Sequence, residues 1–476
     1  MIPVLTPEEM KAVDAAASEP VEALVERAGA AVARRALDLL GGSYGRRVTV
    51  VTGKGNNGAD GRAAAARLRR RGVRVELLDA ASDAREVPAC DLVVDAAFGT
   101  GFHGEYRAPD PLGAPVLAVD IPSGLDGLTG EAADDAVWAD ATITFAALKP
   151  GLVLADGPER TGVVELADIG LDVSEARAHV VQGGDVVLWM PPRSRDAHKW
   201  QRAVWVVAGS PGMAGAASLC ARAALRAGAG YARLGSPGVD AAALPATEVT
   251  GLSLPAEGWA DAVLADLGRF GALVVGPGLG RSAATVAAVQ RVVAGAPVPV
   301  LVDGDGLFAL GTADEAAALV RGREHPTVLT PHDGEFARLT GGPPAADRLG
   351  AARAAAATTG ATVLLKGSTT VVAEPGGRAL LSLAGDRRLA TAGTGDVLSG
   401  VVGALLADSL DGLRAAAAGA YVHGLAGRLG PRRGLVAGDL LELLPRALSD
   451  LAIEARPGGG PRDEARPGGG PRDEES

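Results

Sequence analysis

An aspartate stands directly after a Gly-Thr-Gly turn in the second half of the chain. The run 391–400 reads TAGTGDVLSG and opens an apolar stretch with the pattern of a helix. Backbone N–H groups at such a turn, with the positive end of the following helix, can bind a phosphate or a developing oxyanion. Asp396 would add a base that activates a hydroxyl for attack on phosphorus. This is the chemistry of a small-molecule kinase, although any glycine-rich turn before a helix has the same pattern.

Other glycine-rich or polar turns follow apolar runs in the same half. Lys366 follows TVLL and could neutralise phosphate charge, or it could be an ordinary lysine at a strand end. His332 precedes an acidic turn, where it could contact a ligand or cap a helix. Each such turn follows the end of an expected strand, so the turns should gather at one edge of the sheet. We therefore expect one large cleft for a nucleotide donor and a nucleotide-like acceptor. The turns are 209–216, 276–280, 303–305, 330–335 and 366–370.

Polar residues also follow three expected strands of the first half. The run 53–61, GKGNNGADG, offers glycines for close approach of the backbone to phosphates, and amide and carboxylate oxygens for a ribose or a cation. Asp95 ends a second strand, and Asp120 and Ser123 end a third. Because the carboxyl ends of parallel strands meet at one edge of a sheet, these oxygens should converge and suit a hard cation. Any single acid could instead cap the next helix.

Alternation of short apolar runs with helical segments predicts how these turns are positioned. Continuous apolar strands between helices indicate parallel sheets covered on both faces. The pattern breaks at Pro191-Pro192 and then resumes. We therefore expect an α/β protein with two three-layer αβα domains, a Rossmann-like one at 1–181 and another at 182–454. Residues 455–476 contain ARPGGGPRDE twice and should be disordered.

Composition argues against several classes of protein. The 476 residues carry a net charge of −11, so a basic face for nucleic acid is not expected. The sequence shows neither a leader pattern nor an apolar run of membrane-spanning length, and we expect a cytoplasmic protein without membrane partners. Cys90 and Cys220 lie in apolar or small-residue surroundings, which suggests buried free thiols in a reducing compartment. We also expect a homo-oligomer.

The first-half motifs GNNGADG, DAAFGTGFHG, VDIPSGLDG and TFAALKPG, in this order, resemble the NAD(P)H-hydrate epimerase domain over nearly all of residues 1–180. By this resemblance Asp120 contacts the epimerising ring as the acid/base, and Asn57, Asp95 and Ser123 bind potassium. Ala59 stands where the family usually has glycine, so a positive φ there would strain the backbone. The residues that would hold the hydrated nucleotide are Asn56, Asn57, Gly58, Ala59, Asp60, Gly99, Thr100, Gly101, Phe102, His103, Gly104, Glu105 and Asp120.

The second-half motifs GPGLG, TPHDGE, LLKGSTT and TAGTGDVLSG resemble the ribokinase-like superfamily across about residues 190–450. More narrowly, they resemble its ADP-dependent NAD(P)H-hydrate dehydratases. The resemblance implies that Gly280, His332 and Asp396 contact the hydrated cofactor. Magnesium is expected with ADP from the chemistry of phosphoryl transfer. The residues that would contact the adenine nucleotide are Lys366, Gly367, Ser368, Thr369, Thr370 and Gly395.

Together the two resemblances imply an enzyme that repairs hydrated NADH and NADPH, known as NADHX and NADPHX. The first domain would interconvert the R and S hydrates. The second would use ADP to dehydrate the S form, with AMP and phosphate as products. Two other functions remain open from the residues: a vitamin or sugar kinase with an inactive front domain, and a nucleotide-binding scaffold protein.

Overall fold

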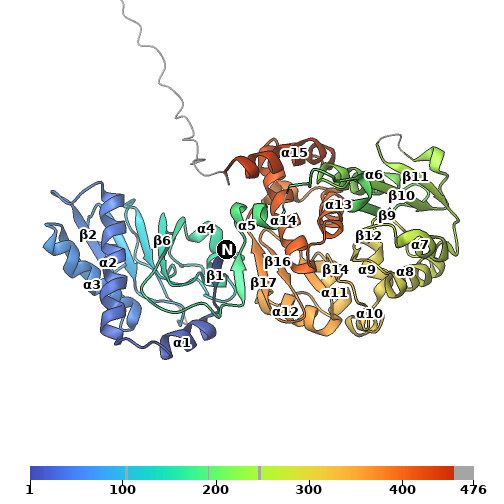
Figure 1. Ribbon diagram of the computed structural model, residues 1–476. Coiled ribbons are helices and arrows are strands. Elements are labelled where there is room, and N and C mark those ends of the chain that lie inside the picture. Colours follow the sequence, from blue (N-terminus) through green and yellow to red (C-terminus); the bar gives the residue numbers. More distant parts are fainter. Residues whose placement is uncertain (102–105, 191, 245–247, 455–476) are drawn as a thin grey trace, which may run out of the picture.

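The computed structural model describes residues 1–101, 106–190, 192–244 and 248–454. Two αβα bodies lie next to each other along the length of the molecule, and each is built on its own sheet (Figure 1). The predicted α/β class with two layered domains is therefore confirmed. The predicted disorder of 455–476 concerns residues outside the described part of the chain.

The first sheet has six parallel strands in the order β3-β2-β4-β5-β6-β7. Its central strands are buried along their whole length, as expected for continuous runs of valine, leucine and isoleucine. The strands are β2 (Arg47–Thr52), β3 (Arg74–Asp79), β4 (Leu92–Ala96), β5 (Val116–Val119), β6 (Ala141–Phe145) and β7 (Val163–Ala167).

Helices cover one face of this sheet, and loops cover much of the other. The helices α2 (Val21–Leu40) and α3 (Asn56–Arg70) pack together over the first face. On the opposite face, Val87, Tyr106 and Val137 come from the connections between β3 and β6. The sequence pattern favoured a helix after each strand, but the described residues of these connections form none. Prolines and glycines, as in 109–115, interrupt helices there.

The second sheet has eleven strands in the order β1-β8-β17-β16-β15-β14-β13-β12-β9-β10-β11. The seven strands from β11 to β15 are parallel to one another, whereas β16 runs antiparallel to β15 and to β17. These strands are β9 (Ala203–Val207), β10 (Tyr231–Pro237), β11 (Thr250–Leu254), β12 (Ala272–Val275), β13 (Val300–Val302), β14 (Thr327–Leu329), β15 (Thr362–Leu365), β16 (Thr370–Ala373) and β17 (Ala379–Ser382).

Helices cover both faces of the second sheet. α13 (Thr394–Ala407) is buried along nearly its whole length, because its apolar sides all pack against the sheet, α6 (Ala214–Arg226) or α14 (Gly412–Leu429). The remaining helices of this half are α7 (Trp259–Leu267), α8 (Ala283–Gly295), α9 (Asp305–Leu310), α10 (Ala313–Val320), α11 (Asp333–Thr340), α12 (Arg348–Thr359) and α15 (Ala437–Glu454), with 3-10 turns η2 (Lys199–Arg202), η3 (Ala241–Ala243) and η4 (Arg387–Leu389).

Two short strands from the first half join the second sheet. β8 (Ala178–Val180) lies parallel to β17, and β1 (Ile2–Val4) lies antiparallel to β8. The predicted domain limits at 181 and 182 stay a prediction, but this pairing ties both ends of the first half to the second domain. The other elements of the first half are α1 (Pro7–Ala15), η1 (Pro150–Leu152) and α4 (Gly157–Arg160), and α5 (Gly183–Trp189) leads into the second half.

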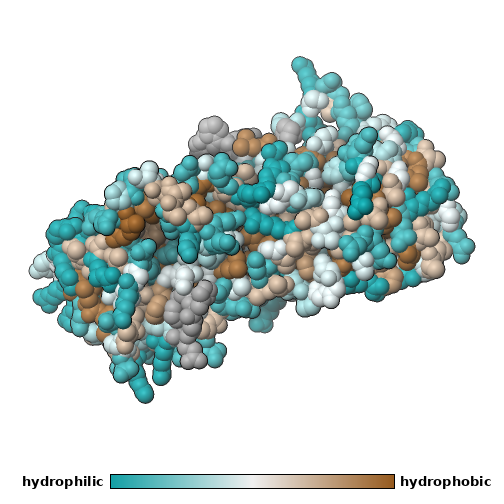
Figure 2. All heavy atoms as spheres, turned by 90° about the horizontal axis from the view of Figure 1, so that it is seen from below, coloured by the Kyte–Doolittle hydropathy of each residue, from teal (hydrophilic) through white to brown (hydrophobic). Residues whose placement is uncertain are grey.

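The junction between the two bodies is apolar. Leu148, Leu152 and Leu154 of the first half are buried in the same cluster as Leu381 of β17. On the face shown in Figure 2, polar residues surround separate apolar patches. None of the helices in the described residues is both long enough and apolar enough to cross a bilayer. Both cysteines are free; Cys220 is buried as predicted, whereas Cys90 is partly exposed.

Candidate active sites

A cavity of about 760 Å³ lies at the carboxyl edge of the first sheet, and residues of α1, α2 and α3 line part of it. Its lining combines a polar strand-end side with an apolar side that includes Leu24 and Phe145. Gly58 and Ala59 do not line this cavity, and residues 102–105 lie outside the described part of the chain. The predicted residues that do meet at this cavity are Asn56, Asn57, Asp60, Gly99, Thr100, Gly101 and Asp120.

A buried lysine lies at the centre of this site. The Lys149 side chain is 2% exposed, and its Nζ lies 2.6 Å from Asp120 Oδ1 and 2.9 Å from Thr144 Oγ1. Asp120 has a φ of +68°, a conformation that aspartate tolerates better than most residues. Sequence reasoning did not assign Lys149 a role. The signal was its place in the TFAALKPG motif of a chain with few lysines.

Two further acids surround the Lys149–Asp120 pair. Burial, and then the charges of Asp120 and Asp14, raise the pKa of Asp60 to about 8. Burial also raises the pKa of Asp14, against the charge of Lys149. The Asp60 side chain makes no hydrogen bond or ion pair with any described residue. One lysine therefore faces three carboxyl groups, of which Asp60 is mostly protonated at neutral pH.

The predicted potassium ligands form a pair and a single residue. Asp95 is buried and accepts hydrogen bonds from the Ser123 amide at 2.8 Å and its hydroxyl at 2.7 Å. Within the described part of the chain, neither polar side-chain atom of buried Asn57 has a hydrogen-bond partner. No described group of three or more His, Cys, Asp or Glu residues could hold a metal ion. These ligands therefore fit either a monovalent cation or a bound ligand that forms hydrogen bonds with the Asn57 amide.

Glycines in the first loop allow close backbone packing. A Cβ atom at Gly58 would come within 2.0 Å of the Gly53 carbonyl oxygen, so any side chain there would displace the loop. Ala59, where we expected glycine, lies inside α3 and is not among the described residues with positive φ. Alanine is the best helix former, so Ala59 brings no backbone strain.

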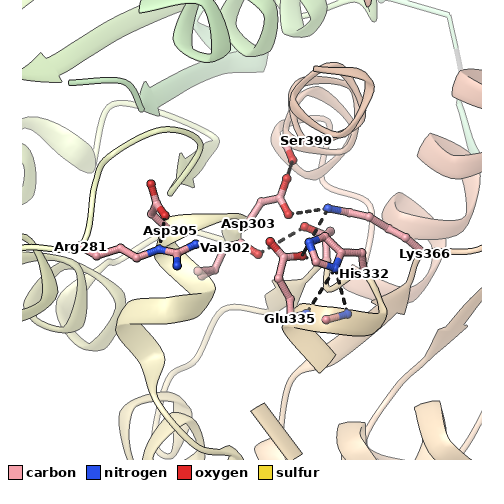
Figure 3. A network of polar contacts seen from close by, with 10 residues as sticks. Arg281, Val302, Asp303, Asp305, His332, Glu335, Lys366 and Ser399 are labelled. Carbon is pink, nitrogen blue, oxygen red and sulfur yellow. Dashed lines mark hydrogen bonds and ion pairs between the residues drawn. The ribbon is translucent and has the colours of Figure 1, made fainter. Parts of the chain in front are cut away.

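In the second half, Lys366 is the centre of a polar network (Figure 3). Its Nζ lies 2.6 Å from Asp303 Oδ1 and 3.9 Å from Glu335 Oε2. Ser399 donates a hydrogen bond of 2.7 Å to the other Asp303 oxygen. Burial lowers the pKa of Lys366, but Asp303 and Glu335 outweigh it and keep the pKa above the usual value. The sequence motifs contained Asp303, Glu335 and Ser399 without identifying them as partners of Lys366.

Asp396 lies in the first turn of α13, beside this network. The helix begins after Gly393, which has a φ of +88°. Burial, and then the charge of Asp303, raise the pKa of Asp396 to about 6, although Lys366 opposes the shift. A Cβ atom at Gly395 would lie 3.5 Å from Lys366 Nζ, so the lysine tip is next to the N-terminus of α13. A cation, free N–H groups and a carboxylate thus meet at one place, as phosphoryl transfer needs.

The other predicted ligand-binding residues lie around this centre in different roles. His332 caps α11, since its Nδ1 accepts from the amides of Gly334 at 3.0 Å and Glu335 at 3.3 Å, while the ring stays 61% exposed. Gly280 has a φ of +78°, and its amide donates to Asp305 at 2.9 Å. The capping interpretation of His332 is therefore correct for Nδ1, while Nε2 lies 3.6 Å from Glu335 Oε2.

The loop 366–370 connects β15 to β16 and includes Thr370, the first residue of β16. The Lys366 carbonyl accepts a bond of 2.8 Å from Arg348. Ser368 makes no side-chain hydrogen bond with any described residue, whereas Thr369 donates to the carbonyl of Val153 in the first half at 2.6 Å. The predicted nucleotide residues are therefore adjacent, but the Thr369 hydroxyl points to the domain junction.

Comparison with known proteins agrees with this geometry in both halves. A family model described as NAD(P)H-hydrate dehydratase matches residues 204–449, and one described as YjeF-related protein N-terminus matches 21–87 and 78–151. The bifunctional NAD(P)H-hydrate repair enzyme Nnr of Mycobacterium tuberculosis is 42% identical, with 84% of this chain and 88% of the relative covered. That of Salinibacter ruber is 38% identical and covers 95% of this chain and 97% of its own length.

One solved structure matches most of the second half. The ADP/ATP-dependent NAD(P)H-hydrate dehydratase from Bacillus subtilis, co-crystallised with ATP and Mg²⁺, aligns with a TM-score of 0.50 and 32% identity. The alignment covers 57% of this chain and 98% of that protein. From the two-domain match and the two sites together, the chain belongs to the family of bifunctional NAD(P)H-hydrate repair enzymes.

Proposed function

We propose that this protein returns hydrated NADH and NADPH to their active forms, with the epimerase site at the Lys149–Asp120 pair and the dehydratase site at Lys366 and Asp396. The family relation supports both activities and favours repair over a vitamin or sugar kinase or a scaffold protein. The observation that carries the assignment is the meeting of Lys366, Asp303 and Asp396 at the N-terminus of α13.

In the dehydratase site, Asp396 takes the proton of the substrate hydroxyl while the hydroxyl oxygen attacks the terminal phosphorus of ADP. The bond from that phosphorus to AMP breaks, and the hydrate now carries a phosphate ester. The backbone N–H groups of Gly393 and Gly395 and the Lys366 ammonium stabilise the charge on the transferring group, whereas the Thr394 amide already donates to the Thr391 carbonyl. The ester bond to carbon then breaks, phosphate leaves with the electron pair, and the neighbouring carbon loses a proton. The ring double bond of NAD(P)H is restored.

Magnesium fits this site as a partner of the ADP phosphates. Mg²⁺ keeps several water and phosphate ligands and needs only one or two protein carboxylates. Glu335, 3.9 Å from the Lys366 ammonium, is the acid that would supply one, because Asp303 is paired with Lys366 and Asp396 serves as the base. When bound, the ion neutralises charge on the phosphates. The related Bacillus subtilis dehydratase was crystallised with ATP and Mg²⁺, which supports this part of the proposal.

In the epimerase site, the substrate hydroxyl is on the carbon next to the ring nitrogen, because water adds to an enamine at that carbon. The Asp120 carboxyl in its protonated form passes a proton to the hydroxyl, water leaves, and the planar cation accepts water from either face. Asp120 then takes the proton back. Lys149 holds the carboxyl group of Asp120 at the end of the strand. Potassium held by Asn57, with Asp95 and Ser123 as the other expected ligands, would neutralise phosphate charge there; the unpartnered Asn57 amide supports such a site.

A single substrate mixture tests both activities. Both epimers of NADPHX are mixed with the protein, ADP and Mg²⁺, and absorbance of the reduced nicotinamide is followed. We expect complete conversion. The D120N variant is the matched control, and it should convert the S form and then continue only at the spontaneous rate of epimerisation. No recovery with either ADP or ATP would contradict the proposal. The expected homo-oligomer stays a prediction that sedimentation can measure.

A further inference from the structure

The loop 366–370 is attached to the first domain by a buried hydrogen bond. Thr369 Oγ1 donates to the backbone carbonyl of Val153 at 2.6 Å across 216 positions of sequence. Both residues are 5% exposed. A hydroxyl has one hydrogen to donate, and that of Thr369 is used in this bond. The Thr369 hydroxyl is therefore unavailable as a donor to the phosphates of ADP.

Val153 lies at the end of a segment that belongs to the epimerase site. This segment, 149–153, contains η1 and begins with Lys149, the partner of Asp120. It packs backbone against backbone, because a Cβ at Gly151 would come within 2.0 Å of the Asp126 carbonyl oxygen. Segment 149–153 thus has little freedom to shift, and a loop bonded to it is held in place.

The second sheet connects the same loop to the same segment by another route. β16 begins directly after Thr369 and is followed across the sheet by β17, β8 and β1. Where β1 ends, the Leu5 amide donates to the Leu148 carbonyl, and the Leu148 amide donates to Pro3, both at 2.9 Å. Leu148 directly precedes Lys149. Loop and segment are therefore joined twice, once through Thr369 and once through four strands of the sheet.

We propose that Thr369 is a positioning residue through which the first domain holds the loop 366–370 in the shape that receives ADP. This inference rests on the proposed function of the second site. Thr369 acts through the backbone of the loop, and Lys366, three positions earlier, is the group that meets phosphate. The dehydratase site is in this sense completed by the epimerase domain, which gives the fusion of the two domains a structural role.

The proposal predicts a specific effect of removing the hydroxyl. The T369V variant keeps the shape of the side chain but leaves the buried Val153 carbonyl without its donor. Losing such a bond should weaken ADP binding about tenfold. T369S keeps the donor and should restore binding. T358V removes the hydroxyl of an exposed threonine of α12, outside the loop 366–370, and serves as the matched control.

Hydrogen exchange in the full chain, measured by mass spectrometry with and without ADP and Mg²⁺, tests the connection. In the wild type, T369S and T358V, ADP should slow exchange both at 366–370 and at 149–157. In T369V the protection at 149–157 should disappear, and the KM for ADP should rise about tenfold with a much smaller change in kcat. A thermal melt checks that the variants fold.

Three results would overturn the inference. In the first, ADP protects 366–370 in the wild type while 149–157 is unaffected; the nucleotide site would then stand and the positioning role would be wrong. In the second, T369V has the wild-type KM for ADP. If ADP protects neither segment, the proposed nucleotide site itself is wrong, and the positioning role falls with it.

Discussion

The ammonium group of Lys149 lies 2.6 Å from the carboxylate of Asp120 at the end of β5, and the same arrangement recurs in the other domain. There Lys366 lies 2.6 Å from Asp303 at the end of β13. In both cases a lysine from a later loop crosses to an aspartate at the carboxyl edge of a parallel sheet. Each pair fixes a carboxylate beside a ligand site without exposing the charges fully to water.

Lys149 should be needed for epimerisation. In K149M the Asp120 carboxylate would face Asp60 and Asp14 without a cation, and its position and charge would both change. We expect the epimerisation rate to fall by about 10²-fold or more, the range for a disturbed acid–base group. Chromatographic separation of the two epimers measures the rate. K11M, at an exposed lysine of α1, is the control. Wild-type epimerisation by K149M would refute this role.

Asp396 should be essential for dehydration alone. D396N keeps the size of the side chain but removes the base, so turnover with ADP should fall by about 10³-fold or more. The epimerase site lies in the other domain and should be unaffected. Recovery of absorbance from the pure S hydrate measures dehydration, and exchange between the two epimers measures epimerisation. A fully active D396N protein would show that another group takes the proton.

The dehydratase should lose activity in mild acid. The pKa of Asp396 is raised to about 6, by burial first and by Asp303 second, and the carboxyl must be ionised to accept a proton. The charged groups around it are Asp303, Glu335 and Lys366. The value of kcat/KM should therefore be level above pH 7 and fall about tenfold per unit below pH 6. A profile that is flat from pH 5 to pH 8 would exclude Asp396 as the titrating base.

Asp60 should make the folded protein less stable as the pH rises. Its pKa is about 8 when folded and near 3.8 when unfolded, so the folded state binds the extra proton between these values. The stability gained from this proton is complete below pH 4 and lost as pH passes 8. D60N removes the effect. At about 1.4 kcal/mol per pKa unit, the D60N substitution should raise the unfolding free energy by up to about 6 kcal/mol at pH 9 and by little at pH 4. Denaturant titrations at both pH values measure this, and equal effects would contradict it.

Potassium should act through Asn57. If a cation occupies the site, replacing K⁺ by a larger organic cation in the buffer should slow epimerisation of the wild type. N57L removes the unpartnered amide and should remove the dependence on K⁺ as well. Calorimetric titration with KCl provides a readout independent of activity. Epimerisation that is insensitive to K⁺ in the wild type would contradict a potassium site at Asn57.

The sequence by itself determined the kind of chemistry and the layered fold. Continuous apolar runs between helices predict parallel sheets, and glycine turns at strand ends predict where ligands bind. The turn before Asp396 could be identified because it depends on local backbone conformation, and Gly393 indeed has positive φ. The motifs also identified Asp120, Asn57 and Asp60, which line one cavity at the carboxyl edge of the first sheet.

Contacts between distant residues were decided by the tertiary structure alone. Lys149 finds Asp120 across 29 positions and Lys366 finds Asp303 across 63. No local pattern encodes such pairs, because they depend on how strands are ordered in the sheet. The Thr369 bond to Val153 is the extreme case, since it requires the first domain to be docked on the second. Burial set the protonation of Asp60 and Asp396 for the same reason: it is a property of packed surroundings, which a sequence motif does not contain.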